Sequence, residues 1–357
     1  MFIAGMRVAF VSMRTARHRD TDGNRRLERL AHSLADRGHD VTVFCAAWWD
    51  DPADRREVDG VTFRAVTVAP ARASFAARLP LLLARYRPDV IHARLYPLAG
   101  VFAASTGGTL GRAPLVIDYY GDEGLSDSRL LTQALSEAAT VITPSELVRT
   151  RVREQGIPDE RTTVIPDAID FSLVSETEPA AETDVAFAHP LDDSANVESL
   201  LLALAELRDR EWTATIIGDG PLRADYERQA ADLRIDDRIT FAGECSRAER
   251  LAIYRGAHTS VQTAYREHFA RELLWALAAG CVGIVEYQAE SSAHELIENH
   301  ARSFHVTDPQ ELADAIVSAG DIERRTIDDA FESYDNDAIL ESYLDLYRRV
   351  QESHGLF

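Results

Sequence analysis

The stretch ATVITPSELVRTRVREQGIPDERTTVIPDAID, residues 139–170, decides the fold class. It opens with a short apolar strand, Thr140-Val141-Ile142, and reaches a second one at Thr163-Val164-Ile165, with a helical segment between them. A strand, a helix and a second strand in this order are typical of a parallel sheet that helices cover on both faces. The same alternation continues on both sides of this stretch.

Toward the N-terminus, the alternation predicts a series of strand–helix units. Leu27, Leu30, Ala31 and Leu34 recur at helical spacing, and Gly38 closes that helix. Apolar strands are expected at residues 7–11, 41–44, 61–68, 89–92 and 114–118.

Toward the C-terminus, residues 172–183 are rich in Ser, Glu, Pro and Ala, which is typical of a linker. The alternation then restarts, with strands expected at 185–188, 213–217, 238–241, 259–262 and 282–285. We therefore predict an α/β protein of two doubly wound, Rossmann-like domains facing a central cleft, where ligands bind at the carboxyl ends of the strands. The predicted N-terminal domain comprises residues 1–172 and the predicted C-terminal domain residues 173–337. A C-terminal helix is expected at 338–357, and it could pack back on the N-terminal domain.

The charge of the chain is strongly acidic. Its 357 residues carry a net charge of −21, and all 38 basic residues are arginine. An acidic excess without lysine indicates adaptation to concentrated salt; a GC-rich genome would explain the arginine but not the 59 carboxylates. Such a surface argues against nucleic-acid binding and weakens the case for a polybasic membrane anchor.

Targeting signals and metal motifs are not evident. No window reaches about 18 consecutive apolar residues, and the start lacks the pattern of a signal peptide. Cys45, Cys245 and Cys281 have no metal-binding spacing. The sequence therefore predicts a cytoplasmic protein with no metal, no transmembrane segment and no nucleic-acid partner, while peripheral contact with a membrane stays open.

Several segments resemble, in the same order, the family 4 retaining glycosyltransferases of the GT-B fold. They are RGHDVTV (37–43), RPDVIHA (87–93), the stretch 139–170 quoted above, IGDGPL (217–222) and REHFARELLWALAAG (266–280). The resemblance implies transfer of a sugar from a nucleotide-sugar donor to a glycan, lipid-linked or small-molecule acceptor, with retention and without a metal or other cofactor. Together with the composition, it suggests a member from a salt-adapted organism of the haloarchaeal type.

For the donor domain, the resemblance implies a set of binding residues. Glu267 matches the family carboxylate that approaches the donor sugar, and the diphosphate would lie at the N-terminus of the following helix, a position that favours anions. The turn after residues 213–217 lets the backbone approach the nucleotide, although it is also an ordinary connector. The predicted donor-binding residues are Gly218, Asp219, Gly220, His189, Arg247, Phe269, Ala270, Arg271 and Glu272.

The donor site departs from the family pattern at three positions. The family's second carboxylate falls on Trp275, and Glu272, one turn earlier, is either its substitute or a plain first-turn carboxylate. Pro190 stands where the family has an arginine, and Ala195 lies near its lysine. His189, Arg247, Arg266 and Arg271 are candidate substitutes, or else surface cations paired with acids.

For the acceptor side, the resemblance points to the first domain. Gly23 and Asn24 occupy the place of the family's glycine-rich loop, and Tyr120 occupies the place of a histidine that contacts the donor sugar. We therefore predict Glu267 and Tyr120 as catalytic residues. The predicted acceptor-side residues are Gly23, Asn24, Asp118 and Asp122. The alternative interpretation of Asp118 and Asp122 is that they are ordinary turn residues at the end of a strand.

Three further functions are weighed. The departures at the donor site favour a non-catalytic GT-B homologue that serves as partner or scaffold in glycan biosynthesis, whereas Glu267 opposes it. A nucleotide-sugar epimerase lacks an acid/base constellation, and a dinucleotide oxidoreductase lacks the G-x-G-x-x-G pattern after the first strand.

Overall fold

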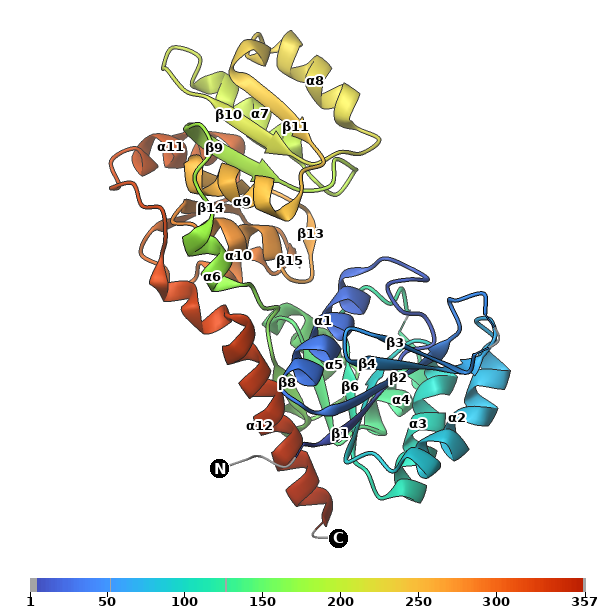
Figure 1. Ribbon diagram of the computed structural model, residues 1–357. Helices are drawn as coiled ribbons and strands as arrows, with labels where there is room; N and C mark the ends of the chain where they lie inside the picture. Colours follow the sequence, from blue (N-terminus) through green and yellow to red (C-terminus); the bar gives the residue numbers. More distant parts are fainter. Residues whose placement is uncertain (1–4, 52, 126, 356–357) are drawn as a thin grey trace. The chain divides into compact units, whose positions relative to one another are not determined.

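The chain folds as two α/β units in the computed structural model, which describes residues 5–51, 53–125 and 127–355 (Figure 1). The first unit runs up to Pro166 and is completed by residues from Asp337 onward; the second is Asp167–Asn336. The sequence places these divisions at 172/173 and 337/338, slightly later in the chain.

An eight-stranded sheet forms the centre of the first unit. Its strand order is β3-β4-β2-β1-β5-β6-β7-β8, and all neighbours are parallel except β3 and β4. The strands are β1 (Arg7–Val11), β2 (Asp40–Ala46), β3 (Arg55–Val58), β4 (Val61–Thr67), β5 (Val90–Arg94), β6 (Leu115–Asp118), β7 (Thr140–Thr143) and β8 (Thr162–Val164).

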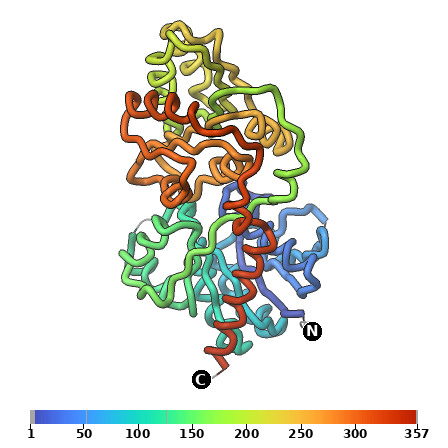
Figure 2. Tube along the Cα trace, turned by 90° about the vertical axis from the view of Figure 1, so that its left-hand side faces the viewer, coloured from blue at the N-terminus to red at the C-terminus, as the bar shows by residue number. Residues whose placement is uncertain are grey.

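Helices cover both faces of this sheet. They are α1 (Asp22–Asp36), α2 (Arg72–Tyr86), α3 (Leu98–Gly111), α4 (Arg129–Ser136), α5 (Glu146–Glu154), the short η1 (Asp159–Arg161) and α12 (Asn336–Gly355). Successive strand residues face opposite sides of a sheet. On one side, Ile91 packs in a core with Phe75 and Leu83 of α2; on the other, His92 meets Tyr347 of α12, the long C-terminal helix in Figure 2.

The second unit has a six-stranded parallel sheet in the order β11-β10-β9-β12-β14-β16. Its strands are β9 (Thr183–Ala188), β10 (Ala214–Ile217), β11 (Ile239–Gly243), β12 (Ala257–Gln262), β14 (Val282–Glu286) and β16 (Ser303–Val306); β13 (Arg266–Glu267) and β15 (Glu290–Ser291) pair separately. Its helices are α6 (Phe171–Glu176), α7 (Val197–Glu206), α8 (Arg223–Asp232), α9 (Arg247–Gly256), α10 (Arg271–Ala278), α11 (Pro309–Ala319) and the short η2 (Asp236–Arg238), η3 (Ala293–Leu296) and η4 (Asp329–Tyr334).

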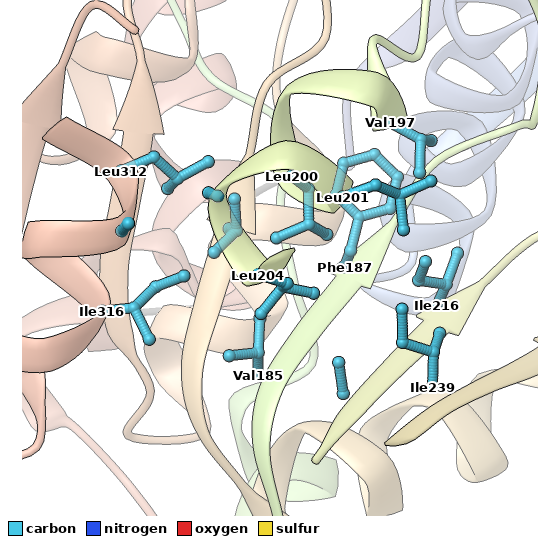
Figure 3. Close-up of a cluster of buried hydrophobic side chains, with 14 of the residues drawn as sticks. Val185, Phe187, Val197, Leu200, Leu201, Leu204, Ile216, Ile239, Leu312 and Ile316 are labelled. Atoms are coloured by element: carbon cyan, nitrogen blue, oxygen red, sulfur yellow. The ribbon is translucent and has the colours of Figure 1, made fainter. Parts of the chain in front are cut away.

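The core of the second unit lies between α7, α11 and the sheet (Figure 3). Leu200 and Leu204 project from α7 onto Val185 and Phe187 of β9, and all four are completely buried. Burial of a large aliphatic or aromatic side chain stabilises a fold by about 1.5–3 kcal/mol. This core therefore fixes β9 and β10, whose carboxyl ends carry the candidate donor loops.

The predicted fold class is confirmed, but several local features differ from the sequence expectations. Residues 171–176 form α6 instead of a linker, because the Asp170 carboxylate caps the helix by accepting a hydrogen bond from the Leu173 N–H at 3.0 Å. The strands β3, β13, β15 and β16 were not expected. β3 has only one residue that is not exposed, so it lacks the apolar pattern of a buried strand.

Candidate functional site

The parallel strands of the second unit end at one edge of its sheet, and three connecting loops meet there. The His189 N–H donates a hydrogen bond to the Ile217 carbonyl oxygen at 3.2 Å, and the Leu191 N–H donates one to the Asp219 carbonyl oxygen at 2.9 Å. These bonds join the loop after β9 to the loop after β10. They place His189 next to the glycine turn that the sequence assigns to nucleotide binding.

Gly218 is required by this close packing. It has a φ of +129°, and a β-carbon at this position would lie 2.1 Å from the His189 carbonyl oxygen. A β-carbon on Gly220 would lie 2.3 Å from the Leu191 oxygen. Both glycines therefore have a packing reason in this chain, in addition to the nucleotide approach that the sequence predicts.

Glu267 and His189 come together at this edge. The Glu267 Oε1 lies 3.4 Å from His189 Nε2, while Gln262 Nε2 donates to the same oxygen at 3.4 Å. His189 Nδ1 lies 2.7 Å from the Pro190 carbonyl oxygen, which can only accept. With Nδ1 donating there, Nε2 donates to Glu267 only when the ring is an imidazolium. The pair thus combines a carboxylate with a side chain able to carry a positive charge.

The N-terminus of α10 follows Glu267 by four residues. Ala270 is the N-cap and has no side chain that accepts from the first turn, so the first N–H groups of α10 have no capping side chain there. Phe269 and Ala270 are buried, and Arg271 is half-buried. Such an end of a helix favours an anion.

Glu272 faces the neighbouring helix α9. Its Oε2 accepts a hydrogen bond from the Tyr254 hydroxyl at 2.6 Å and lies 3.5 Å from Arg250 Nε. Burial, followed by the Glu272 charge, raises the pKa of Tyr254 well above its ordinary value. Arg250 is a cation near the start of α10 that sequence reasoning missed; Arg247 is exposed at the start of α9.

A second polar cluster lies at the end of β14 and was not expected from the sequence. The buried Glu286 carboxylate accepts from the Ser199 hydroxyl, from Asn196 Nδ2 at 3.4 Å and from Gln288 Nε2 at 2.9 Å. Burial raises the pKa of Glu286. The signal was present in the sequence, because Glu286 closes an apolar strand where a parallel sheet presents ligand-binding residues.

In the first unit, Gly23 and Asp122 meet at a small cavity. The Gly23 N–H donates to Asp122 Oδ2 at 2.8 Å, and Arg94 Nη2 donates to Asp122 Oδ1 at 2.6 Å. The cavity has a volume of about 30 Å³, enough for a water molecule or two. Asn24 and Glu123 also line it. Three of the predicted acceptor-side residues are therefore brought together here.

Arg94 links the half-buried carboxylate of Asp122 and the buried carboxylate of Glu123 at this cavity. Its Nη2 lies 2.6 Å from Asp122 and 3.1 Å from Glu123. Burial raises the pKa of Glu123 to about 7, although the Arg94 charge opposes the shift. Burial alone would also raise the pKa of Asp122. The Arg94 charge and the hydrogen bond from the Gly23 N–H outweigh burial, so the pKa of Asp122 is lowered. The pKa values of the two neighbouring carboxyl groups are therefore shifted in opposite directions.

Asp118 and Tyr120 are both buried. Asp118 has no exposed surface; its Oδ2 lies 3.1 Å from Arg26 Nε and 3.5 Å from His92 Nε2. Burial alone raises the pKa of Asp118, but the Arg26 charge and the His92 hydrogen bond outweigh it and lower the pKa. Tyr120 is 2% exposed. In this structure Asp118 therefore belongs to a structural ion-pair network and does not line the cavity at Asp122.

Residues 5–51, 53–125 and 127–355 contain no group of three His, Cys, Asp or Glu side chains arranged to hold a metal ion. In the same ranges no helix has the length and apolar character needed to cross a membrane.

Each unit has a Rossmann-like architecture, and the candidate site lies at the carboxyl edge of the sheet. These features define the fold of the chain as that of a GT-B glycosyltransferase. Residues 23–173 match the domain family described as Glycosyltransferase Family 4, and residues 170–326 match the family described as Glycosyl transferases group 1. The chain therefore has the domain composition of a GT-B glycosyltransferase.

Known proteins support this assignment at different levels. The 2-deoxystreptamine glucosyltransferase of Streptomyces kanamyceticus is 27% identical over 167 residues, which cover 41% of this chain and 42% of that enzyme. The structure of a glycosyltransferase from Rickettsia africae matches 98% of this chain and 99% of its own, with a TM-score of 0.79 and 14% identity. Anabaena HepE, solved with UDP and glucose, matches 96% of this chain and all of its own, with a TM-score of 0.72 and 19% identity. At these identities the two structures show the fold alone.

Proposed function

We propose that this chain transfers a sugar from a nucleotide-sugar donor to a glycan, lipid-linked or small-molecule acceptor, with retention of configuration and without a metal, in the cytoplasm. The observation that carries the proposal is the approach of Glu267 to His189 beside the uncapped start of α10. A departing nucleoside diphosphate gains negative charge, and N–H groups with a cation at that point stabilise the charge as it develops.

In this proposal each side chain has one task. His189, as an imidazolium, and the first N–H groups of α10 hold the diphosphate, while Glu267 lies against the donor sugar. Asn24 and Asp122 orient the acceptor hydroxyl from the first unit. No strong base is required of Tyr120, since a phenol is a poor base near neutral pH.

A nucleotide screen tests donor binding. UDP, GDP and ADP are each added to the full chain in concentrated salt, and thermal unfolding is recorded. A diphosphate at about 100 times its dissociation constant stabilises the protein by about 2.7 kcal/mol. We expect one of the three to raise the unfolding temperature. If none of them does, the non-catalytic alternative replaces the transferase.

Hydrolysis of the matching nucleotide-sugar tests the role of Glu267. We expect Glu267→Gln to slow the reaction about a hundredfold or more, the scale for removing one group that stabilises a transition state. Glu290→Gln is the matched control, because Glu290 is exposed on the paired strand β15 and forms an ion pair with Arg266 at 3.0 Å. Equal rates for the two variants would remove Glu267 from the mechanism.

A further inference from the structure

The charge of the chain is distributed very unevenly. Residues 60–117 contain seven arginines and one carboxylate, Asp89, so this segment has a net charge of +6 within a chain of net charge −21. The single carboxylate is engaged, because Asp89 Oδ2 accepts a hydrogen bond from the Arg7 N–H at 2.7 Å. The segment runs from β4 through α2, β5 and α3 into β6 of the first unit.

Four of the seven arginines, Arg72, Arg78, Arg85 and Arg112, are exposed on α2 or at the end of α3, whereas Arg94 of β5 is buried and pairs with Asp122 and Glu123. The two helices lie side by side (Figure 1) and approach closely, since a β-carbon on Gly107 of α3 would lie 2.8 Å from Leu83 of α2. We give the name α2–α3 surface to six exposed side chains of this layer: Arg72, Arg78, Leu81, Arg85, Leu110 and Arg112.

Exposed aliphatic side chains lie between these cations. Leu81 is 74% exposed. It lies three residues after Arg78 and four before Arg85, so the three side chains share one face of α2. Leu110, near the end of α3, is 65% exposed. Leucines with this exposure beside guanidinium groups form the pattern of a surface that lies at a lipid–water interface.

Three cations of this surface have no carboxylate partner, unlike many arginines elsewhere in the chain. Within the described part of the chain, no carboxylate lies within 4.0 Å of the guanidinium of Arg78, Arg85 or Arg112, whereas Arg37, for example, contacts both Asp337 and Glu341. At the rim, Glu137 accepts from Ser105 of α3 and Asp40 from Tyr86 of α2. In a chain with a large carboxylate excess, this segregation leaves positive charge available for an external anionic partner.

We propose that the α2–α3 surface docks the protein on an anionic lipid bilayer. The aliphatic side chains enter the acyl boundary and the arginines contact lipid phosphates. A protein partner is less well matched, because the centres of protein interfaces are enriched in aromatic residues, and the exposed apolar residues here are leucines. The acidic remainder does not prevent docking, because at 0.1 M salt charges act over only about 10 Å and the nearest surface dominates.

Vesicle co-sedimentation of the full chain tests the proposal. We expect binding to vesicles of phosphatidylglycerol mixed with phosphatidylcholine, a decrease as salt rises, and no binding to phosphatidylcholine alone. The double substitution Arg78→Gln/Arg85→Gln should weaken binding about 25-fold, which corresponds to about 1 kcal/mol per arginine. Leu81→Asp should weaken it further, because it removes the inserted side chain and adds a repelled charge.

Matched controls come from the second unit. Arg228→Gln on α8 and Leu202→Asp on α7 alter an exposed arginine and an exposed leucine outside the surface, and both should bind as the unsubstituted chain does. Thermal unfolding confirms that each variant is folded. Equal binding by all variants, or equal binding to both vesicle types, would overturn the proposal.

Two other outcomes are separable. If the chain forms a dimer without vesicles and Leu81→Asp abolishes it, the surface is an interface between copies and the bilayer proposal is wrong. Because co-sedimentation needs no catalysis, its result does not depend on the proposed transferase activity. Hydrolysis of a soluble donor should be the same in all these variants.

Discussion

His92 Nδ1 lies 2.7 Å from the hydroxyl oxygen of Tyr347, which joins a central strand to a helix 255 positions later in the chain. His92 Nε2 lies 3.5 Å from Asp118, so a neutral ring that carries its proton at Nε2, facing this carboxylate, accepts at Nδ1 from the Tyr347 O–H. Burial lowers the pKa of His92, which is consistent with a neutral ring. The contact therefore anchors α12 to the first unit.

Removal of this hydroxyl should loosen α12. Tyr347→Phe leaves the buried Nδ1 of His92 without a donor, which costs about 1–3 kcal/mol. We expect faster hydrogen exchange in β5 and α12, while exchange in the second unit serves as an internal reference. Tyr265→Phe is the control, because the Tyr265 side chain is 47% exposed. Unchanged exchange in α12 would mean that this hydrogen bond does not anchor the helix.

The Glu123 carboxyl should make stability depend on pH. Its pKa is raised from 4.5 to about 7 in the folded chain, so the folded state binds more protons than the unfolded state between these values. The free energy of unfolding therefore decreases as pH rises through this window, by an amount on the order of 3 kcal/mol. Below about pH 4.5 both states are protonated and this cost is absent.

Glu123→Gln tests this assignment, because the amide resembles the protonated acid. We expect the substituted chain to gain stability relative to the natural one as pH rises from about 5 to 8. The measurement is denaturant unfolding at several pH values, with Glu137→Gln as the control on an exposed carboxyl group. A constant difference across the range would show that Glu123 does not titrate there.

The fold was predictable because each unit repeats the same local signal. Buried parallel strands such as β5 and β14 are short apolar runs, and their order along the chain specifies a doubly wound sheet. β3 was missed because an edge strand that is mostly exposed carries no such run. The α6 helix was missed because its stability depends on the cap at Asp170, in a segment whose composition is that of a loop.

The candidate site was less predictable, because its contacts join distant residues. Glu267 and His189 follow from motif positions, but the Arg26–Asp118 pair spans 92 residues and has no local signal. Asp118 therefore looked like an accessible strand-end carboxylate although it is fully buried. Similarly, the net charge of the whole chain concealed the basic segment at residues 60–117, since an average says nothing about segregation.

The acidic excess should make the fold depend on salt. A net charge of −21 imposes repulsion within each molecule, and salt screens it. We expect the unfolding temperature to rise as KCl is increased from about 0.1 M to about 1 M, where the Debye length falls from about 10 Å to about 3 Å. Thermal unfolding followed by circular dichroism measures it. A falling unfolding temperature would indicate that ion pairs outweigh the repulsion and would argue against salt adaptation.

His189 should distinguish diphosphates from monophosphates. If its ring holds the diphosphate beside the start of α10, His189→Ala removes one charged hydrogen bond, worth about 1.5–3 kcal/mol, and lowers the affinity for the nucleoside diphosphate about tenfold or more. The affinity for the corresponding monophosphate should change little, because the nucleoside and first phosphate keep their contacts. Calorimetric titration gives both constants, and His305→Ala on the edge strand β16 is an exposed-histidine control. Equal losses for the two nucleotides would place His189 among the residues that shape the loop, since its carbonyl already packs against Gly218.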